Sequence, residues 1–167
     1  LEGMGSHGYK AATFHNVGSN YPVYKDIQTH VVDAGLAAGD GSNVGSVLYN
    51  RGLYAAMTAA LGAQTAQDIH GTADITAAMM RDGLENIKMT DAAMAAAGLP
   101  KFGPEFEGSC ANHGGTGQVG IQQWDGNKQA WKLIGGFESP DMKVIGALIT
   151  ADSEAYAKEN NITPRDC

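Results

Sequence analysis

The stretch "GTGQVGIQQWDGNKQAWKLIG", residues 115–135, begins with the spacing G-x-G-x-x-G of a dinucleotide-binding turn. That motif binds a pyrophosphate only between a buried strand and a helix N-terminus. The residues before it, "FEGSCANHG" at 106–114, are too polar for a buried strand. The residues after it alternate around Asp125-Gly126, a dipeptide typical of hairpin turns. The stretch therefore predicts an antiparallel hairpin with strands at 119–124 and 128–134, and no helix at Gly120.

The composition places the chain among ordinary globular proteins. Its 167 residues are 43% hydrophobic, which is enough for a core in one domain or in a piece of a larger one. The formal charge of −7 argues against nucleic-acid binding, which needs a basic face. No apolar run is long enough to insert in a membrane. The start, "LEGMGSH", lacks the parts of a signal peptide, an observation without weight if the chain begins within a longer protein.

Hydrophobic periodicity and capping residues predict more helix than strand. The expected elements are a strand at 8–14, a helix from Pro22 to about Gly35, a long helix at 44–67 capped by Ser42 or Asn43, a third helix capped by Asp74, a fourth from Thr90 or Asp91 to Gly98, and a final helix at 147–160. The long helix is expected to present Val44, Val47, Leu48, Tyr54 or Ala55, Thr58 and Leu61 on one face. Three or four strands cannot cover so many helices, so part of the fold is expected to be missing.

Histidines and acids near each other raise the question of a metal site. His70 and Asp74 share helical spacing, and Cys110 lies three residues before His113. A zinc site needs three or four clustered ligands, and no second pair completes either candidate. These side chains are therefore interpreted as surface or loop residues, with no metal and no cofactor.

No catalytic motif is present either. The sequence has no G-x-S-x-G elbow, H-E-x-x-H pair or P-loop lysine. Glu105 and Glu107 alternate along an extended stretch, which a solvated strand edge explains as well as a catalytic pair does. The two cysteines, Cys110 and Cys167, are compatible with buried thiols, a reactive pair or a disulfide that tethers the polar tail.

Four stretches together carry a family resemblance. "GYKAATFH" (8–15), "NYPVYKDI" (20–27), "VLYNRGL" (47–53) and "LPKFGPEFEGSCANHGGTGQVGIQQWDG" (99–126) resemble the type I periplasmic solute-binding proteins of branched-chain amino-acid ABC transporters. The resemblance implies an α/β fold, the later part of a two-lobed clamshell. Residues 1–14 would be the end strand of one lobe, 15–135 a lobe segment with the long helix and hairpin, and 136–167 the terminal helix and tail.

The resemblance also implies a function without chemistry of its own. Such a protein captures a small solute in the periplasm and delivers it to a membrane permease, without nucleic acid and without inserting in the membrane. A ligand-sensing receptor domain is the alternative, and the glycine spacing leaves a nucleotide-cofactor enzyme as a disfavoured third. An exported relative also favours a disulfide between Cys110 and Cys167.

Candidate ligand-binding residues come from two arguments. The resemblance aligns Val44 with a ligand-contacting position and Tyr49 with a tyrosine of the long helix. Phe14 and His15 follow the first strand, and ligands of α/β sheets lie beyond strand ends. Val44 and Tyr49 supply only one wall of a cleft, so we expect the chain alone to bind small solutes weakly.

Overall fold

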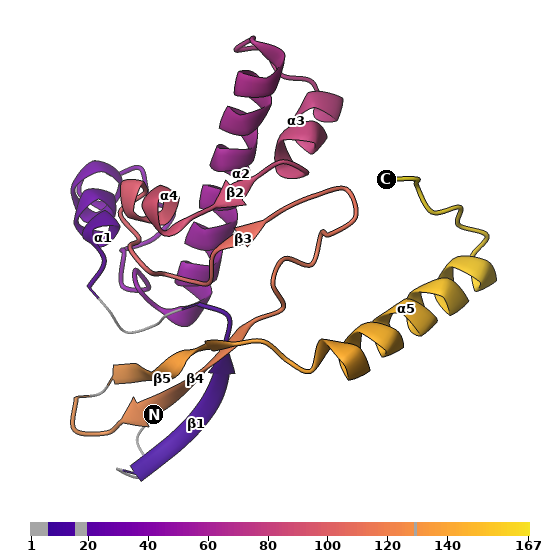
Figure 1. Ribbon diagram of the computed structural model, residues 1–167. Helices are drawn as coiled ribbons and strands as arrows, with labels where there is room; N and C mark the ends of the chain where they lie inside the picture. Colours follow the sequence, from indigo (N-terminus) through magenta and orange to yellow (C-terminus); the bar gives the residue numbers. More distant parts are fainter. Residues whose placement is uncertain (1–6, 16–19, 129) are drawn as a thin grey trace.

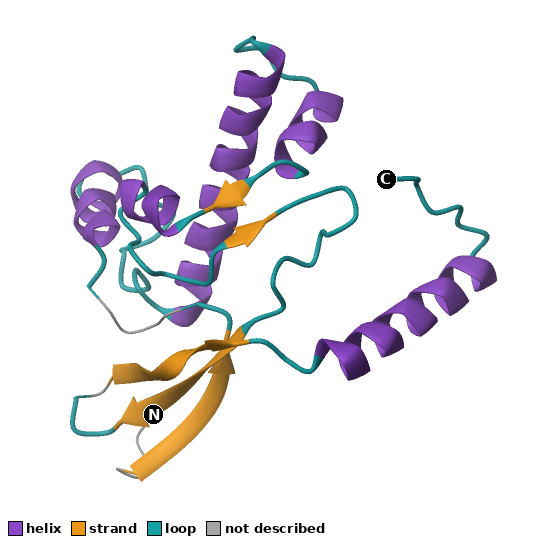
Figure 2. Cartoon of the chain, in the orientation of Figure 1, coloured by secondary structure: helices purple, strands orange, loops and turns teal. Residues whose placement is uncertain are grey.

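The computed structural model describes residues 7–15, 20–128 and 130–167, as a mixture of helices and two small antiparallel sheets (Figure 1, Figure 2). The elements in chain order are β1 (His7–Thr13), α1 (Pro22–Ile27), the π-helical turn η1 (Gln28–Val32), α2 (Val47–His70), α3 (Ala77–Leu84), β2 (Lys88–Met89), α4 (Asp91–Ala96), β3 (Phe106–Glu107), β4 (Val119–Asp125), β5 (Ala130–Glu138) and α5 (Met142–Glu159). Residues 1–6, 16–19 and 129 lie outside this description. They belong to the predicted end-strand segment 1–14, to the predicted turn that follows it, and to the predicted hairpin strand 128–134.

The larger sheet has the strand order β1-β4-β5, all antiparallel. β4 and β5 form the predicted hairpin, and Gly120 lies within β4, so the dinucleotide-binding interpretation is excluded. The connection is longer than a two-residue turn, because Asp125 pairs with Ala130 and leaves four residues between the strands. The Asp125 carboxylate accepts hydrogen bonds from the amides of Asn127 and Lys128, at 3.0 and 3.1 Å, which stabilises this wider loop.

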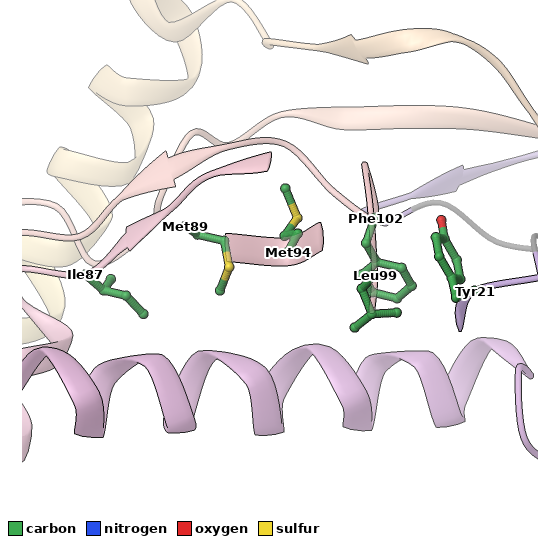
Figure 3. Close-up of a cluster of buried hydrophobic side chains, with 6 residues drawn as sticks. All are labelled: Tyr21, Ile87, Met89, Met94, Leu99 and Phe102. Atoms are coloured by element: carbon green, nitrogen blue, oxygen red, sulfur yellow. The ribbon is translucent and has the colours of Figure 1, made fainter. Parts of the chain in front are cut away.

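The core lies along one side of α2. Six side chains form its buried centre: Tyr21, Ile87, Met89, Met94, Leu99 and Phe102. Figure 3 shows them between α2 and the segment that carries β2 and α4. Leu53, Tyr54, Met57 and Leu61 of α2 pack against them. The long helix therefore supplies the surface on which the short elements assemble.

The apolar face of α2 differs from the predicted one at its start. Val47 and Leu48 are exposed, whereas Asn50 is fully buried. The Asn50 amide oxygen accepts a 2.7 Å hydrogen bond from the Tyr24 hydroxyl, which satisfies a polar group inside the protein. Burial raises the pKa of Tyr24, against the lowering effect of this hydrogen bond. The first turn of α2 therefore buries Asn50 instead of Val47 and Leu48.

α2 and α3 are in close contact where both lack bulky side chains. Gly83 of α3 lies so near Gly62 and Ala66 of α2 that a Cβ atom there would be 2.1 Å from the Gly62 carbonyl oxygen and 2.8 Å from the Ala66 Cβ. Gly62 and Gly83 are both buried. The distance between the two helices is therefore set by glycine.

Two helix starts were predicted too early. α2 is capped by Ser46, whose hydroxyl accepts from the Tyr49 amide, and not by Ser42 or Asn43. Ser42 instead donates its amide to the Asp40 carboxylate in the preceding turn. α3 is capped by Thr76, not Asp74, through a bond from the Met79 amide.

The ends of α4 and α5 are explained by their capping residues. Thr90 caps α4 as predicted, and Gly98 adopts the left-handed conformation just beyond it (φ 74°). α5 begins at Met142, five residues before the predicted Ala147, because the Asp141 carboxylate accepts from the Lys143 amide. The predicted start overlooked this cap in the turn "ESPD".

We predict that the glycine contact between α2 and α3 controls stability. Gly83→Ala is expected to lower the free energy of unfolding by about 1–3 kcal/mol, because the added methyl group must displace α2 backbone. Gly52→Ala is the matched control, since nothing lies within 4 Å of a Cβ at that exposed helical position. It should raise stability by about 0.5–1 kcal/mol. Urea unfolding of both variants tests this, and equal effects would contradict it.

Candidate functional site: the tail clasp

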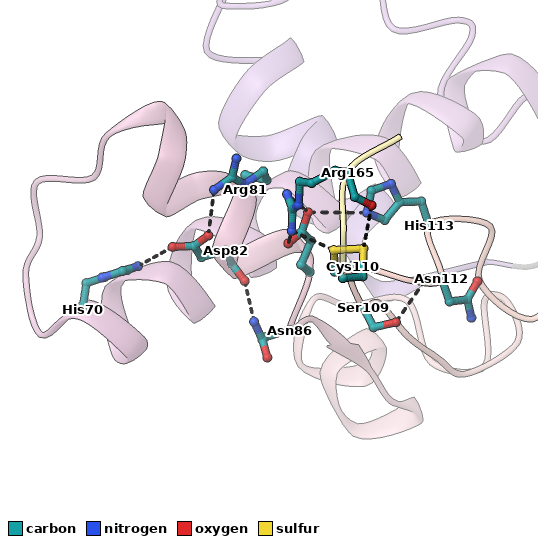
Figure 4. Close-up of polar contacts among 11 residues, drawn as sticks. His70, Arg81, Asp82, Asn86, Ser109, Cys110, Asn112, His113 and Arg165 are labelled. Carbon is teal, nitrogen blue, oxygen red and sulfur yellow. Dashed lines mark hydrogen bonds and ion pairs between the residues drawn. A yellow bond between two sulfur atoms is a disulfide. The ribbon is translucent and has the colours of Figure 1, made fainter. Parts of the chain in front are cut away.

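A polar cluster among the described residues anchors the C-terminal tail to the end of α3. We call it the tail clasp and define it by Glu85, Cys110, His113, Arg165 and Cys167. Figure 4 shows Cys110, His113 and Arg165 close together beside the end of α3. Cys110 and Cys167 form a disulfide with a Cα–Cα distance of 5.4 Å, as predicted. A covalent bond and an ion pair thus hold the same short tail.

Glu85 is the centre of the cluster. Its carboxylate accepts two hydrogen bonds from the Arg165 guanidinium, at 2.9 and 2.7 Å, in the bidentate geometry that makes such pairs strong. His113 Nε2 lies 3.5 Å from the same carboxylate. The Glu85 side chain is only 10% exposed, so these partners replace most of its water.

The charges around Glu85 change its titration. The hydrogen bonds from Arg165 lower the pKa of the Glu85 carboxyl below its ordinary value, and the positive charges of Arg165, Arg81 and His113 act in the same direction. The carboxylate in turn raises the pKa of Arg165. Glu85 therefore stays ionised and keeps the tail bound at neutral pH.

The loop that carries Cys110 and His113 is shaped by short polar bonds. The Ser109 hydroxyl accepts from the Asn112 amide at 3.0 Å, and the Asn112 side chain donates to the Gly115 carbonyl at 3.1 Å. Gly115 and Gly117 adopt the left-handed conformation, with φ of 65° and 63°. The glycines of the dinucleotide-like motif thus turn this loop into β4 instead of holding a phosphate.

A hollow of about 340 Å³ opens beside the clasp. It is lined by Thr58, Arg81, Leu84, Glu85, Ile87, Phe106, Gly108, Asn112, His113 and Gly115. A second hollow, of about 260 Å³, shares Phe106, His113 and Gly115 with the first and also contains Phe14. His113 therefore stands between two neighbouring hollows that have mainly apolar walls.

The predicted ligand-binding residues do not form one site. Val44 and Tyr49 line a third hollow, of about 390 Å³, together with Val31 and Leu36. Phe14 lines the second hollow and is 61% exposed. His15 is 5% exposed, stacked on Phe102 with ring centroids 4.9 Å apart, so it belongs to the core. A ligand-binding role for any of these four residues stays a prediction.

The metal candidates have other partners. His70 lies 3.2 Å from Asp82 of α3, not beside Asp74, and Cys110 is held in the disulfide. The part of the chain that the structure describes holds no group of three or more His, Cys, Asp or Glu side chains suited to a metal.

Sequence reasoning missed the ion pair of the clasp. Glu85 and Arg165 are 80 residues apart, and neither belongs to a motif. One indication of this ion pair is present in the sequence: Arg165 lies two residues before Cys167, and the disulfide of Cys167 with Cys110 was predicted.

Comparison with known proteins gives one informative similarity. No protein-family model matches the chain, and no curated protein matches it. The chain is similar to a crystal structure described as an ABC transporter permease from the Pseudomonas fluorescens group, with a TM-score of 0.79 and 32% sequence identity. The similarity covers 95% of this chain and 38% of that protein, so this chain spans well under half of its relative's length.

This comparison contradicts the identification as a type I periplasmic solute-binding protein, and with it the predicted solute-capture function. The similar protein is described as a permease, the membrane component of a transporter. The resemblance was based on four short sequence stretches, of which the hairpin at 113–126 was the most specific, and a fold can carry several functions. Transport is thus the function class of the similar protein. Among the described residues, no helix has the length and apolar character needed to cross a lipid bilayer.

We predict that the disulfide stabilises the folded chain. It closes a loop of 57 residues, for which the chain-entropy model gives about 4 kcal/mol. A reductant should lower the free energy of unfolding of the natural chain and leave Cys167→Ser unchanged. Urea unfolding with and without reductant measures this. Free thiols in the non-reduced protein, detected by mass spectrometry, would contradict the bond itself.

The lowered pKa of Glu85 predicts acid sensitivity of the clasp. A carboxyl with a lower pKa in the folded than in the unfolded state stabilises the fold above the ordinary value of 4.5, and this stabilisation is lost as pH falls toward the folded pKa. Glu85→Gln should therefore be less stable than the natural chain at neutral pH, and the difference should shrink below pH 4.5. Thermal unfolding across pH measures this difference.

The matched control is Glu107→Gln. Glu107 lies 3.5 Å from Lys88, and its side chain is 72% exposed, so removing its charge should change stability little. A difference between Glu85→Gln and the natural chain that is the same at pH 7 and in acid would disprove the assignment.

Proposed function

We propose that this chain is part of a component of an ABC transport system, that it performs no covalent chemistry, and that it works outside the cytoplasm. The observation that carries the proposal is the similarity of 95% of the chain, at 32% identity, to a protein described as an ABC transporter permease. Because the chain spans 38% of that protein, the activity belongs to a larger unit of which this chain is one part.

The disulfide supports the proposed location. Disulfides persist in oxidising compartments such as the periplasm and are rare in the cytosol. The Cys110–Cys167 bond joins the tail to a loop 57 residues earlier, so its reduction would release the tail from one of its two anchors. An extracytoplasmic location therefore suits a chain whose tail depends on this bond.

The proposed partners are the other subunits of the same ABC transport system, because the similar protein is described as a component of such a system.

Uptake measurements test the transport role. Deletion of the gene that encodes this chain should abolish uptake of at least one solute from a panel of labelled amino acids, amides, urea and aromatic acids. The natural gene should restore uptake. The control strain lacks the ATP-hydrolysing subunit of the same system and should lose the same solute. If the control strain loses uptake while the deletion strain keeps it, the proposal is wrong.

A further inference from the structure

α5 carries an apolar surface that the described residues leave uncovered. We call this surface the α5 stripe and define it by Met142, Ile145, Leu148, Ile149 and Tyr156. These side chains recur at three- and four-residue spacing, which places them along one broad side of the helix. They are between 40% and 61% exposed, and no residue of α5 is buried. The opposite side carries Lys143, Thr150, Glu154 and Lys158.

An uncovered stripe of this kind does not stabilise its own helix. Isolated helices of about 15 residues are marginal in water, and most helical stability in proteins comes from packing of the apolar side. Exposed apolar patches bordered by polar residues mark interaction surfaces. The stripe therefore requires a partner surface.

Both ends of α5 are attached to the rest of the chain. Its first turn is capped by Asp141 directly after β5, and the tail that follows it is bound by the clasp through Arg165 and Cys167. Figure 1 shows the helix standing apart from α2 and α3, between these two attachments. The stripe is thus presented on a helix tethered at both ends.

We propose that the α5 stripe docks onto a folded unit equivalent to the part of the Pseudomonas protein that this chain does not match. The match covers 38% of that protein, which leaves 62% outside it. The unmatched 5% of this chain is about eight residues, fewer than the 18 of α5, so at least part of the helix has a counterpart there. The helix is therefore shared, and the additional polypeptide is available to cover it.

The stripe also defines the chemistry of the docking surface. Its centre carries aliphatic side chains and Tyr156, so the partner must offer an apolar surface. Asp152 and Glu159 lie on the same side of the helix as the stripe, since Asp152 is three residues after Ile149 and Glu159 is three residues after Tyr156. A lysine or arginine within the partner surface would complement them. This inference does not depend on the transport role.

Hydrogen exchange in two intact proteins tests the proposal. An amide in an uncovered helix exchanges rapidly, whereas packing of the helix slows exchange. The segment of the Pseudomonas protein aligned with α5 should exchange at least about tenfold more slowly than α5 of this 167-residue chain. Equal rates in the two proteins would overturn the proposal.

A chimaera identifies the side chains responsible. In the chimaera, the segment of the Pseudomonas protein that this chain matches is replaced by this chain. The double substitution Ile145→Asp and Ile149→Asp in the chimaera should then return hydrogen exchange in α5 to the rate seen in the free chain. Thr150→Asp, on the opposite side, is the control and should leave exchange slow. If both variants behave alike, the stripe is not the docking surface.

A second copy of this chain is the competing occupant. Sedimentation of the 167-residue chain would then show a dimer that Ile149→Asp dissociates, with α5 already slow to exchange. That result would overturn the proposal, whereas a monomer with rapid exchange in α5 supports it.

Discussion

The absence of a side chain at Gly83 is the constraint on which much of the structure depends. A Cβ atom there would collide with the backbone of α2, so glycine sets how closely α3 can lie against the long helix. The position of α3 against α2 fixes the position of Glu85, which is the C-cap residue of α3. Glu85 in turn binds Arg165 and orients the tail. A contact between two glycines is thus connected, through one carboxylate, to the placement of the last helix.

Local patterns predicted much of this fold. The hairpin followed from alternation around Asp125-Gly126, α4 from Thr90 and Gly98, and the length of α2 from its periodicity. Helix starts were less accurate, because several Ser, Thr and Asp residues near each start can cap and only the turn geometry selects one. Ser42 lies in the turn at Asp40, to whose carboxylate it donates its amide, whereas Ser46 directly precedes α2 and caps it.

The candidate site was less predictable because its contacts are distant in the chain. The disulfide could be expected from two cysteines and a polar tail, but the ion pair beside it joins residues without a motif. The predicted ligand-binding residues do not line one common hollow, for a related reason. Phe14 and His15 are neighbours in sequence, yet the backbone sends one side chain into an open hollow and buries the other against Phe102. Sequence proximity at a strand end does not decide which side of the chain faces solvent.

The tail clasp and the α5 stripe both determine how α5 is held in place. A helix that buries none of its own residues gains little from the chain that carries it. A covalent bond and a bidentate ion pair at the tail restrict where such a helix can go without requiring apolar contact along it. This restriction reduces the conformational freedom that α5 must lose when a partner covers the stripe. The ion pair at Glu85 therefore favours docking of the α5 stripe onto a partner, because a helix that is already tethered at both ends loses less conformational entropy when it binds.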